Sequence, residues 1–129
     1  MPQALKLTIL AETFAVSKLD KGVPVPNWAS SGGWWSVTRT DDELSIVCPE
    51  VQVPTDAISN RGWKCLKVAG PLDLALTGIL ASLLEPLAEA RISVFSVSTF
   101  DTDYLLVKTE NLAATASLLS LAGFQILDA

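Results

Sequence analysis

The stretch that decides the fold is Trp63-Lys64-Cys65-Leu66-Lys67-Val68-Ala69-Gly70-Pro71-Leu72-Asp73-Leu74. Residues 63–69 are typical of a β-strand, and the glycine-proline pair that follows ends the strand. Asp73 is a suitable N-cap for a helix, and the residues beyond it are apolar at helical spacing. Pro86 falls near the end of this pattern, so we expect the last turn to kink or its hydrogen-bond ladder to stop there.

The C-terminal part continues this alternation of strand and helix. Residues 92–97 and 104–107 predict a hairpin, and Asn111 can cap a helix that Gly123 would end. A closing strand is predicted over residues 124–127. The resulting order is strand, helix, strand, strand, helix, strand, which is the βαββαβ ferredoxin-like α+β arrangement of one antiparallel sheet with two helices on a single face.

Part of this hairpin occurs twice in the chain. Ser36–Val47 aligns without a gap on Ser96–Val107, sixty residues later, with four identical positions. Such a period indicates two small modules packed about a pseudo-two-fold axis, with a seam that could hold a small ligand. Asp, Thr and Ser also populate hairpin turns for local reasons, so four identities in twelve positions could arise by chance.

The first half contains further extended segments. These are the runs 4–10, 14–19, 34–40 and 44–48. A loop rich in proline and glycine occupies residues 23–33, where the first long helix of the module would lie, and residues 55–60 could form one helical turn. We therefore expect a degenerate module over residues 1–61 and a complete module over residues 62–129, each too small to be stable without the other.

Composition narrows the classes of function. Nine basic residues against fourteen acidic ones give a net charge of −5, and no Lys/Arg cluster exists, which argues against nucleic acids and anionic membranes as partners. The start Met1-Pro2-Gln3 lacks the basic segment of a signal peptide, and the apolar run 72–84 is too short to span a bilayer. We expect a soluble cytoplasmic protein.

Catalytic and metal chemistry has little support in the sequence. There is no histidine, and no nucleophile and base stand at a recognisable spacing. Cys48 and Cys65 lack a Cys-x-x-Cys arrangement, so buried reduced thiols are the simplest interpretation. We expect no catalytic residue, no metal site and no cofactor. The carboxylates, hydroxyls and Tyr104 leave an enzyme as the weaker alternative.

The order of elements, with Gly70-Pro71-Leu72-Asp73-Leu74 at the first strand-to-helix junction, resembles the ACT domain, a small regulatory module that commonly binds amino acids. More closely, the chain resembles the tandem ACT-domain family of amino-acid sensors that includes the CASTOR-type arginine sensors of animals. The matching segments are 38–48, 70–73, 76–80 and 98–107. This chain has two modules where the animal sensors have four, so a homodimer could be the complete assembly, and the match does not establish arginine as the ligand.

The resemblance and the residue types together place a ligand site on two elements. Backbone at Gly70-Pro71 can approach a small molecule closely, and the unpaired N–H groups of the following helix favour a carboxylate. Asp101 and Asp103 can accept hydrogen bonds from an ammonium or guanidinium group. The expected ligand-binding residues are Gly70, Pro71, Leu72, Asp73, Thr77, Gly78, Ser98, Thr99, Phe100, Asp101 and Asp103.

Most of these residues also have a purely structural explanation. Gly70-Pro71 is a common turn, and Asp101-Thr102 suits a hairpin turn wherever it occurs. Asp103 is the stronger candidate because it begins a strand, where aspartate is disfavoured. We predict a regulatory protein that senses an amino acid between ACT-like modules and signals through an unknown downstream protein. The alternative is a ligand-free protein–protein interaction module.

Overall fold

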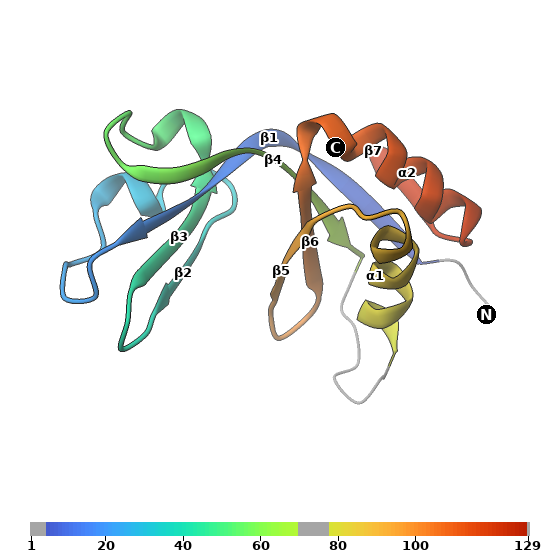
Figure 1. The fold of residues 1–129 in the computed structure, drawn as a ribbon, viewed down its shortest axis with the longest axis horizontal. Helices are drawn as coiled ribbons and strands as arrows, with labels where there is room; N and C mark the ends of the chain where they lie inside the picture. The colour runs from blue at the N-terminus through green and yellow to red at the C-terminus, as the bar shows by residue number, and fades with distance from the viewer. Residues whose placement is uncertain (1–4, 70–77, 129) are drawn as a thin grey trace. The chain divides into compact units, whose positions relative to one another are not determined.

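The computed structural model describes residues 5–69 and 78–128 (Figure 1). The chain divides into two compact units, a larger unit of residues 1–11 and 64–129 and a smaller unit of residues 12–63. Strands β1 (Lys6–Leu19) and β4 (Ile58–Val68) each contribute a part to both units. The sequence analysis placed residues 1–61 in the first module, but β1 begins beside the last strand of the chain, and residues 1–11 therefore belong to the larger unit.

The larger unit combines parts of β1 and β4 with five further elements in its described residues. These are α1 (Ile79–Glu89), β5 (Val94–Ser98), β6 (Asp103–Lys108), α2 (Leu112–Leu121) and β7 (Gln125–Asp128). The strand order within this unit is β7-β1-β4-β6-β5. Strands β5 and β6 are antiparallel, whereas β7 runs parallel to β1. The expected purely antiparallel sheet is therefore mixed, because β7 pairs with a strand from the start of the chain.

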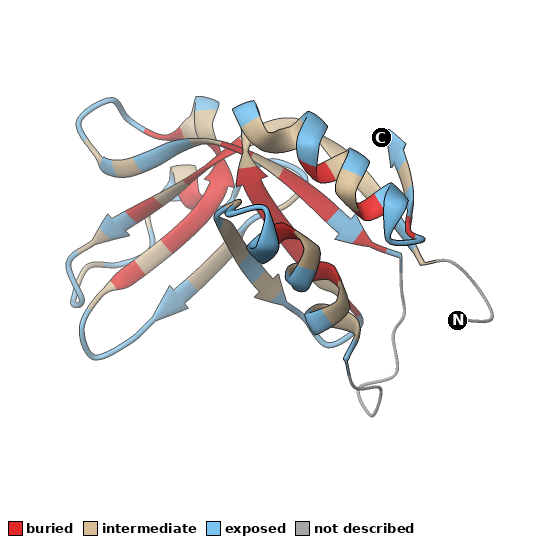
Figure 2. Ribbon diagram, turned by 45° about the vertical axis from the view of Figure 1, so that its right-hand side comes forward, coloured by how far each residue is buried: buried red, intermediate tan, exposed pale blue. Residues whose placement is uncertain are grey.

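Both helices cover one face of the sheet in the larger unit. Their buried leucines are Leu83, Leu87 and Leu119, and these pack with the strand residues Leu7, Leu66, Val68, Leu105 and Val107. In β4 and in β6 these core residues alternate along the strand, so they lie on the same face. Figure 2 shows the buried positions along the helices and strands. The unit thus has the ferredoxin-like α+β arrangement with its helices on a single face.

The first described residue of α1 follows a glycine in a left-handed conformation. Gly78 has a φ of +81°, and the helix begins at Ile79. A helix capped by Asp73 would have included Gly78, but this backbone geometry is incompatible with a right-handed helix interior. Asp73, the expected N-cap, lies outside the described residues. The helix also continues past Pro86 to Glu89.

Helix α2 begins and ends where the sequence predicts. It follows Asn111, the last residue of the 3-10 turn η3 (Thr109–Asn111), although the Asn111 side chain makes no capping hydrogen bond. At the other end Gly123 has a φ of +102°, and the Phe124 N–H donates to the Leu119 carbonyl over 3.0 Å. This pattern is a standard glycine stop, which leads the chain directly into β7.

The smaller unit is a sheet covered by loops rather than helices. Beside its parts of β1 and β4 it contains β2 (Ser36–Arg39), β3 (Leu44–Pro49) and the 3-10 turns η1 (Asn27–Ser30) and η2 (Glu50–Gln52). The strand order is β2-β3-β1-β4, with Leu19 opposite Leu44. One core cluster of this unit consists of Ala15, Ala29, Leu44, Ile46, Cys48 and Val53.

Two expectations for the first 61 residues are wrong. Lys6–Leu19 form one continuous strand in place of the two expected over residues 4–10 and 14–19, because no glycine or proline interrupts it. The helical turn expected over residues 55–60 is absent, since β4 begins at Ile58. This strand continues through Gly62, which has a φ of +82° and whose N–H donates to Glu50 Oε1 over 2.9 Å.

Candidate functional site

The candidate site is the turn between β5 and β6, residues 99–102. The Thr99 N–H donates to the Thr102 carbonyl over 2.8 Å, and the Thr99 hydroxyl donates to the same oxygen over 3.1 Å. The Thr102 N–H is 3.3 Å from the Thr99 hydroxyl oxygen. A threonine that bonds to the backbone across its own turn stabilises one loop conformation. The turn is therefore a defined scaffold for the side chains at its ends.

A buried hydroxyl attaches this turn to the adjacent strand. Thr102 is 6% exposed, and its hydroxyl donates to the carbonyl of Val68 over 2.6 Å. Val68 is the last residue of β4 and precedes Gly70 by two positions. The bond holds the turn at the carboxyl end of β4. Sequence reasoning missed Thr102 as a positioning residue, and the available signal was a hydroxyl at the last position of a hairpin turn.

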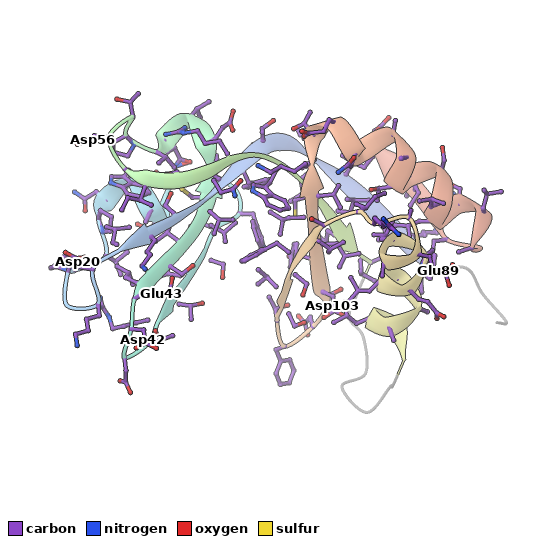
Figure 3. All side chains as sticks on the ribbon, in the orientation of Figure 1. Asp20, Asp42, Glu43, Asp56, Glu89 and Asp103 are labelled. Carbon is purple, nitrogen blue, oxygen red and sulfur yellow. The ribbon has the colours of Figure 1, made fainter. Side chains whose placement is uncertain are left out.

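Asp103 begins β6 directly after the turn. It lies opposite Ser98, and the Ser98 hydroxyl donates to Asp103 Oδ1 over 2.6 Å. Figure 3 shows Asp103 at the turn end of the hairpin. A hydroxyl bond to one oxygen restricts the rotation of the carboxylate, which leaves a negatively charged acceptor oriented at the mouth of the turn.

The structure brings some of the predicted site residues together and leaves others untested. The residues gathered at this turn are Ser98, Thr99, Phe100, Asp101 and Asp103. Phe100 and Asp101 are exposed at its tip, with Phe100 81% exposed. Gly78 lies at the start of α1. The residues outside the described part of the chain are Gly70, Pro71, Leu72, Asp73 and Thr77.

A second polar region lies in the smaller unit, where the sequence analysis placed no ligand. Three adjoining hollows, of about 570, 410 and 350 Å³, all include Lys18 of β1 in their walls. Their lining also includes Asp20 and the turn residues Asp41 and Asp42.

The cysteines are not suited to nucleophilic chemistry. Cys48 and Cys65 are both buried thiols. Burial raises the pKa of the Cys48 thiol, and the positive charge of Arg61 only partly offsets this effect. A thiol with a raised pKa is mostly protonated near neutral pH and is a weak nucleophile.

The described residues contain neither a metal-binding cluster nor a helix that could cross a membrane. Within residues 5–69 and 78–128, no group of three or more His, Cys, Asp or Glu side chains could hold a metal ion. In the same part of the chain, no helix has the length and apolar character needed to cross a membrane.

The elements of the larger unit match a known protein family. A family model described as ACT domain matches residues 58–126, which cover β4 and the larger unit up to β7. The chain belongs to the ACT domain family. A second model, of an N-terminal domain, matches residues 12–56 in the smaller unit. Family and fold agree, since the first match covers the βαββαβ elements.

Curated relatives of this ACT protein include animal arginine sensors. It is 34% identical over 98 residues to the human cytosolic arginine sensor for mTORC1 subunit 1, covering 70% of this chain and 30% of that protein. It is 28% identical over 100 residues to human CASTOR3P, covering 67% of this chain and 61% of that protein. The chain therefore spans about a third of the arginine sensor and under two thirds of CASTOR3P. The resemblance to these sensors is confirmed.

Solved structures extend the comparison over nearly the whole chain. A crystal structure of an Agrobacterium tumefaciens protein has a TM-score of 0.92 and 44% identity, and covers 98% of this chain and 94% of that one. An aspartate kinase from Clostridium acetobutylicum, described as an allosteric enzyme, has a TM-score of 0.64 at 10% identity, over 87% of this chain and 33% of that one. The kinase match supports the ACT-like α+β fold alone.

Proposed function

We propose that this protein is a non-catalytic regulator that binds an amino acid at an interface between ACT-like modules. Membership of the ACT domain family and the similarity to a protein named as a cytosolic arginine sensor support this function. The two modules, one of them degenerate, would be brought together by the ligand, and a homodimer would provide further interfaces. Binding would then change the relative placement of modules and signal to a downstream protein in the cytoplasm.

The bond from the Thr102 hydroxyl to the Val68 carbonyl carries this proposal. It fixes the acidic, hydroxyl-rich turn beside the end of β4, which leads in sequence to the Gly70-Pro71 segment that resembles an ACT ligand loop. Asp103 would accept hydrogen bonds from the ammonium group of the ligand, with Ser98 orienting its carboxylate. Dissociation constants of about 10 μM to 1 mM require only about 4–7 kcal/mol of binding free energy, which a few charged contacts can supply.

The test is calorimetry of the full chain with each of the twenty amino acids, supported by thermal shift. We expect at least one to bind, and we expect Asp103→Asn to weaken that binding about tenfold or more, because the substitution removes a charge-assisted acceptor. Asp56→Asn, an exposed carboxylate in the smaller unit, is the matched control and should bind normally. Silence from all twenty at millimolar concentration, with the fold intact by circular dichroism, would reject the proposal.

The alternative is a ligand-free interaction module, and two observations favour it. Strand β5 stands at the end of the strand order in the larger unit, and Phe100 at the tip of its turn is 81% exposed. An edge strand can pair with a strand of another chain, and an exposed aromatic ring can add apolar contact. Association with another chain that Phe100→Ser removes, and that no amino acid alters, would support this function over sensing.

A further inference from the structure

We propose that the smaller unit carries a second binding site, which takes a short aliphatic amino acid. The site is the β1-end groove, formed by the end of β1, the loop at residues 20–24, the turn at residues 40–43 and Ile58. It goes beyond the proposed function, whose contacts lie on the β5–β6 turn of the larger unit.

The groove corresponds in position to the candidate site of the larger unit. The Thr40 N–H donates to the Glu43 carbonyl over 2.9 Å, and the Glu43 N–H donates to the Thr40 hydroxyl oxygen over 3.1 Å. The Thr99–Thr102 turn is closed by the same two kinds of bond. Because Leu44 lies opposite Leu19, the Thr40–Glu43 turn lies at the end of β1, as the other turn lies at the end of β4.

One wall of the groove is held in place by an arginine. Arg39, the last residue of β2, donates to the Lys21 carbonyl over 2.5 Å and to the Val23 carbonyl over 2.7 Å. The Val23 N–H donates to the Asp20 carbonyl over 3.2 Å, which closes the loop into a turn. A loop fixed at three points loses little conformational entropy when a ligand binds, so even a shallow groove can bind a small molecule.

The groove has an apolar part and a charged part. The apolar part, a hollow of about 570 Å³, includes Leu19, Val23, Pro24 and Ile58 in its walls. Ile58 is 73% exposed, which leaves an apolar side chain without cover beside the hollow. A volume of this size falls within the usual range for small-molecule pockets.

The charged part adjoins the apolar part and contains both signs of charge. Its hollow of about 410 Å³ is lined by Lys18 and Lys21 as well as Asp20, Asp41 and Asp42. Figure 3 shows Asp20, Asp42 and Glu43 at the same end of the smaller unit. The lysines disfavour a bare metal cation and the carboxylates disfavour a bare anion, whereas a zwitterion satisfies both.

An aliphatic amino acid matches the lysines, the aspartates and the apolar wall of the groove. Its carboxylate would pair with Lys18 or Lys21 and its ammonium group with Asp41 or Asp42. Its side chain would then cover Ile58 and remove apolar surface from water. Since the charges are exposed to solvent, each ionic contact contributes little, and we expect millimolar affinity.

The direct test is an NMR titration of the ¹⁵N-labelled full chain with L-leucine. We expect saturable shifts of the backbone amides in residues 18–23, 41–43 and 58. Three matched probes isolate the contacts: glycine lacks the side chain, 4-methylpentanoate lacks the ammonium group and isopentylamine lacks the carboxylate. Each should bind about threefold or more weakly than leucine. No saturable shift in these segments up to about 20 mM leucine would overturn the proposal.

Substitutions at exposed positions test the contacts without disturbing the core. Lys21→Gln and Asp42→Asn should each weaken leucine binding about two- to fivefold, and Asp103→Asn should leave it unchanged. Loss of the groove shifts with Asp103→Asn, or no effect of Lys21→Gln and Asp42→Asn combined, would overturn the proposal. Failure of the sensing function can be distinguished from failure of the groove proposal. The ligand response of the sensing site depends on Asp103 and should be unchanged by Asp42→Asn.

Discussion

The two hairpin turns of this protein are closed alike but attached to their sheets differently. In the smaller unit Arg39 reaches from an exposed position to two loop carbonyls. In the larger unit the buried Thr102 hydroxyl reaches one strand carbonyl. Water competes for the exposed contacts but not for the buried one, so the same turn chemistry has different energetic consequences in the two units.

The strand pairing of the two hairpins also corrects the offset of the internal repeat. Arg39 lies opposite Leu44 and Ser98 lies opposite Asp103, so equivalent hairpin positions are 59 residues apart rather than sixty. The closing bonds agree, since Thr40 corresponds to Thr99. An offset of one residue assigns every strand side chain to the opposite face. The gapless alignment was therefore one residue out of step, and turn chemistry is the better guide to equivalence.

The largest expected effect on stability concerns the helices that cover the core of the larger unit. Among the described residues, α-helices cover only this unit. Leu119 of α2 is buried in its core, whereas Leu121 of the same helix is 86% exposed. Leu119→Ala should lower the free energy of unfolding by about 2–5 kcal/mol through lost burial and a cavity. Urea titration followed by circular dichroism measures the change.

Leu121→Ala is the matched control for this substitution and should change the free energy of unfolding by no more than about 0.5 kcal/mol. Tryptophan fluorescence adds a probe of the smaller unit alone, since all four tryptophans of the chain lie within residues 12–63. Equal losses for the two leucine variants would show that α2 does not cover the core as described.

The next effect tests the buried attachment of the candidate site. Thr102→Val keeps the shape of the side chain but leaves the Val68 carbonyl without the hydroxyl that it accepts. An unsatisfied buried acceptor should cost about 1–3 kcal/mol of unfolding free energy. Thr102→Ser retains the hydroxyl and should recover most of this loss in the same urea titration. A valine variant as stable as the parent would show that the Thr102 hydroxyl does not hold the turn in place.

The fold of the larger unit could be predicted because its signals are local. Gly123 ends α2, a short continuous apolar run marks β6, and the hairpin turns contain typical turn residues. The pairing of β7 with β1 could not be predicted, because Lys6 and Gln125 are distant in sequence and a parallel pairing leaves no local signature. The continuation of β1 through residues 11–13 was missed because the sequence indicated two separate extended runs, 4–10 and 14–19.

The candidate site could be predicted only in part. Residue type and strand position made Asp103 a candidate ligand-binding residue, and the structure adds Ser98 as its hydrogen-bond partner. Thr102 was missed because its function depends on Val68, a contact between residues 34 positions apart. The groove at the end of β1 was missed for the same reason, since a cavity arises from tertiary placement of ordinary surface residues.

A smaller effect concerns the exposed attachment in the smaller unit. Arg39→Met removes two hydrogen bonds to the carbonyls of Lys21 and Val23 but retains most of the side-chain length. Because the site is exposed, the loss should be about 0.5–1.5 kcal/mol, less than for Thr102→Val. Unfolding followed by tryptophan fluorescence measures it. Arg39→Lys keeps the charge without the forked donor geometry, so a full rescue by lysine would show that charge rather than geometry fixes the loop.

The smallest effect is a pH dependence of the smaller unit. Burial raises the pKa of the Cys48 thiol above its ordinary value of 9.0, and the positive charge of Arg61 partly opposes this effect. The native state therefore holds this proton more tightly than the unfolded state, so the contribution to stability is complete below pH 9.0 and is lost as the pH rises through the folded-state value. Cys48→Ala should reduce the fall in stability at alkaline pH, measured by urea titration with tryptophan fluorescence at several pH values. Parallel pH profiles for the parent and the variant would show that the thiol ionises equally in both states.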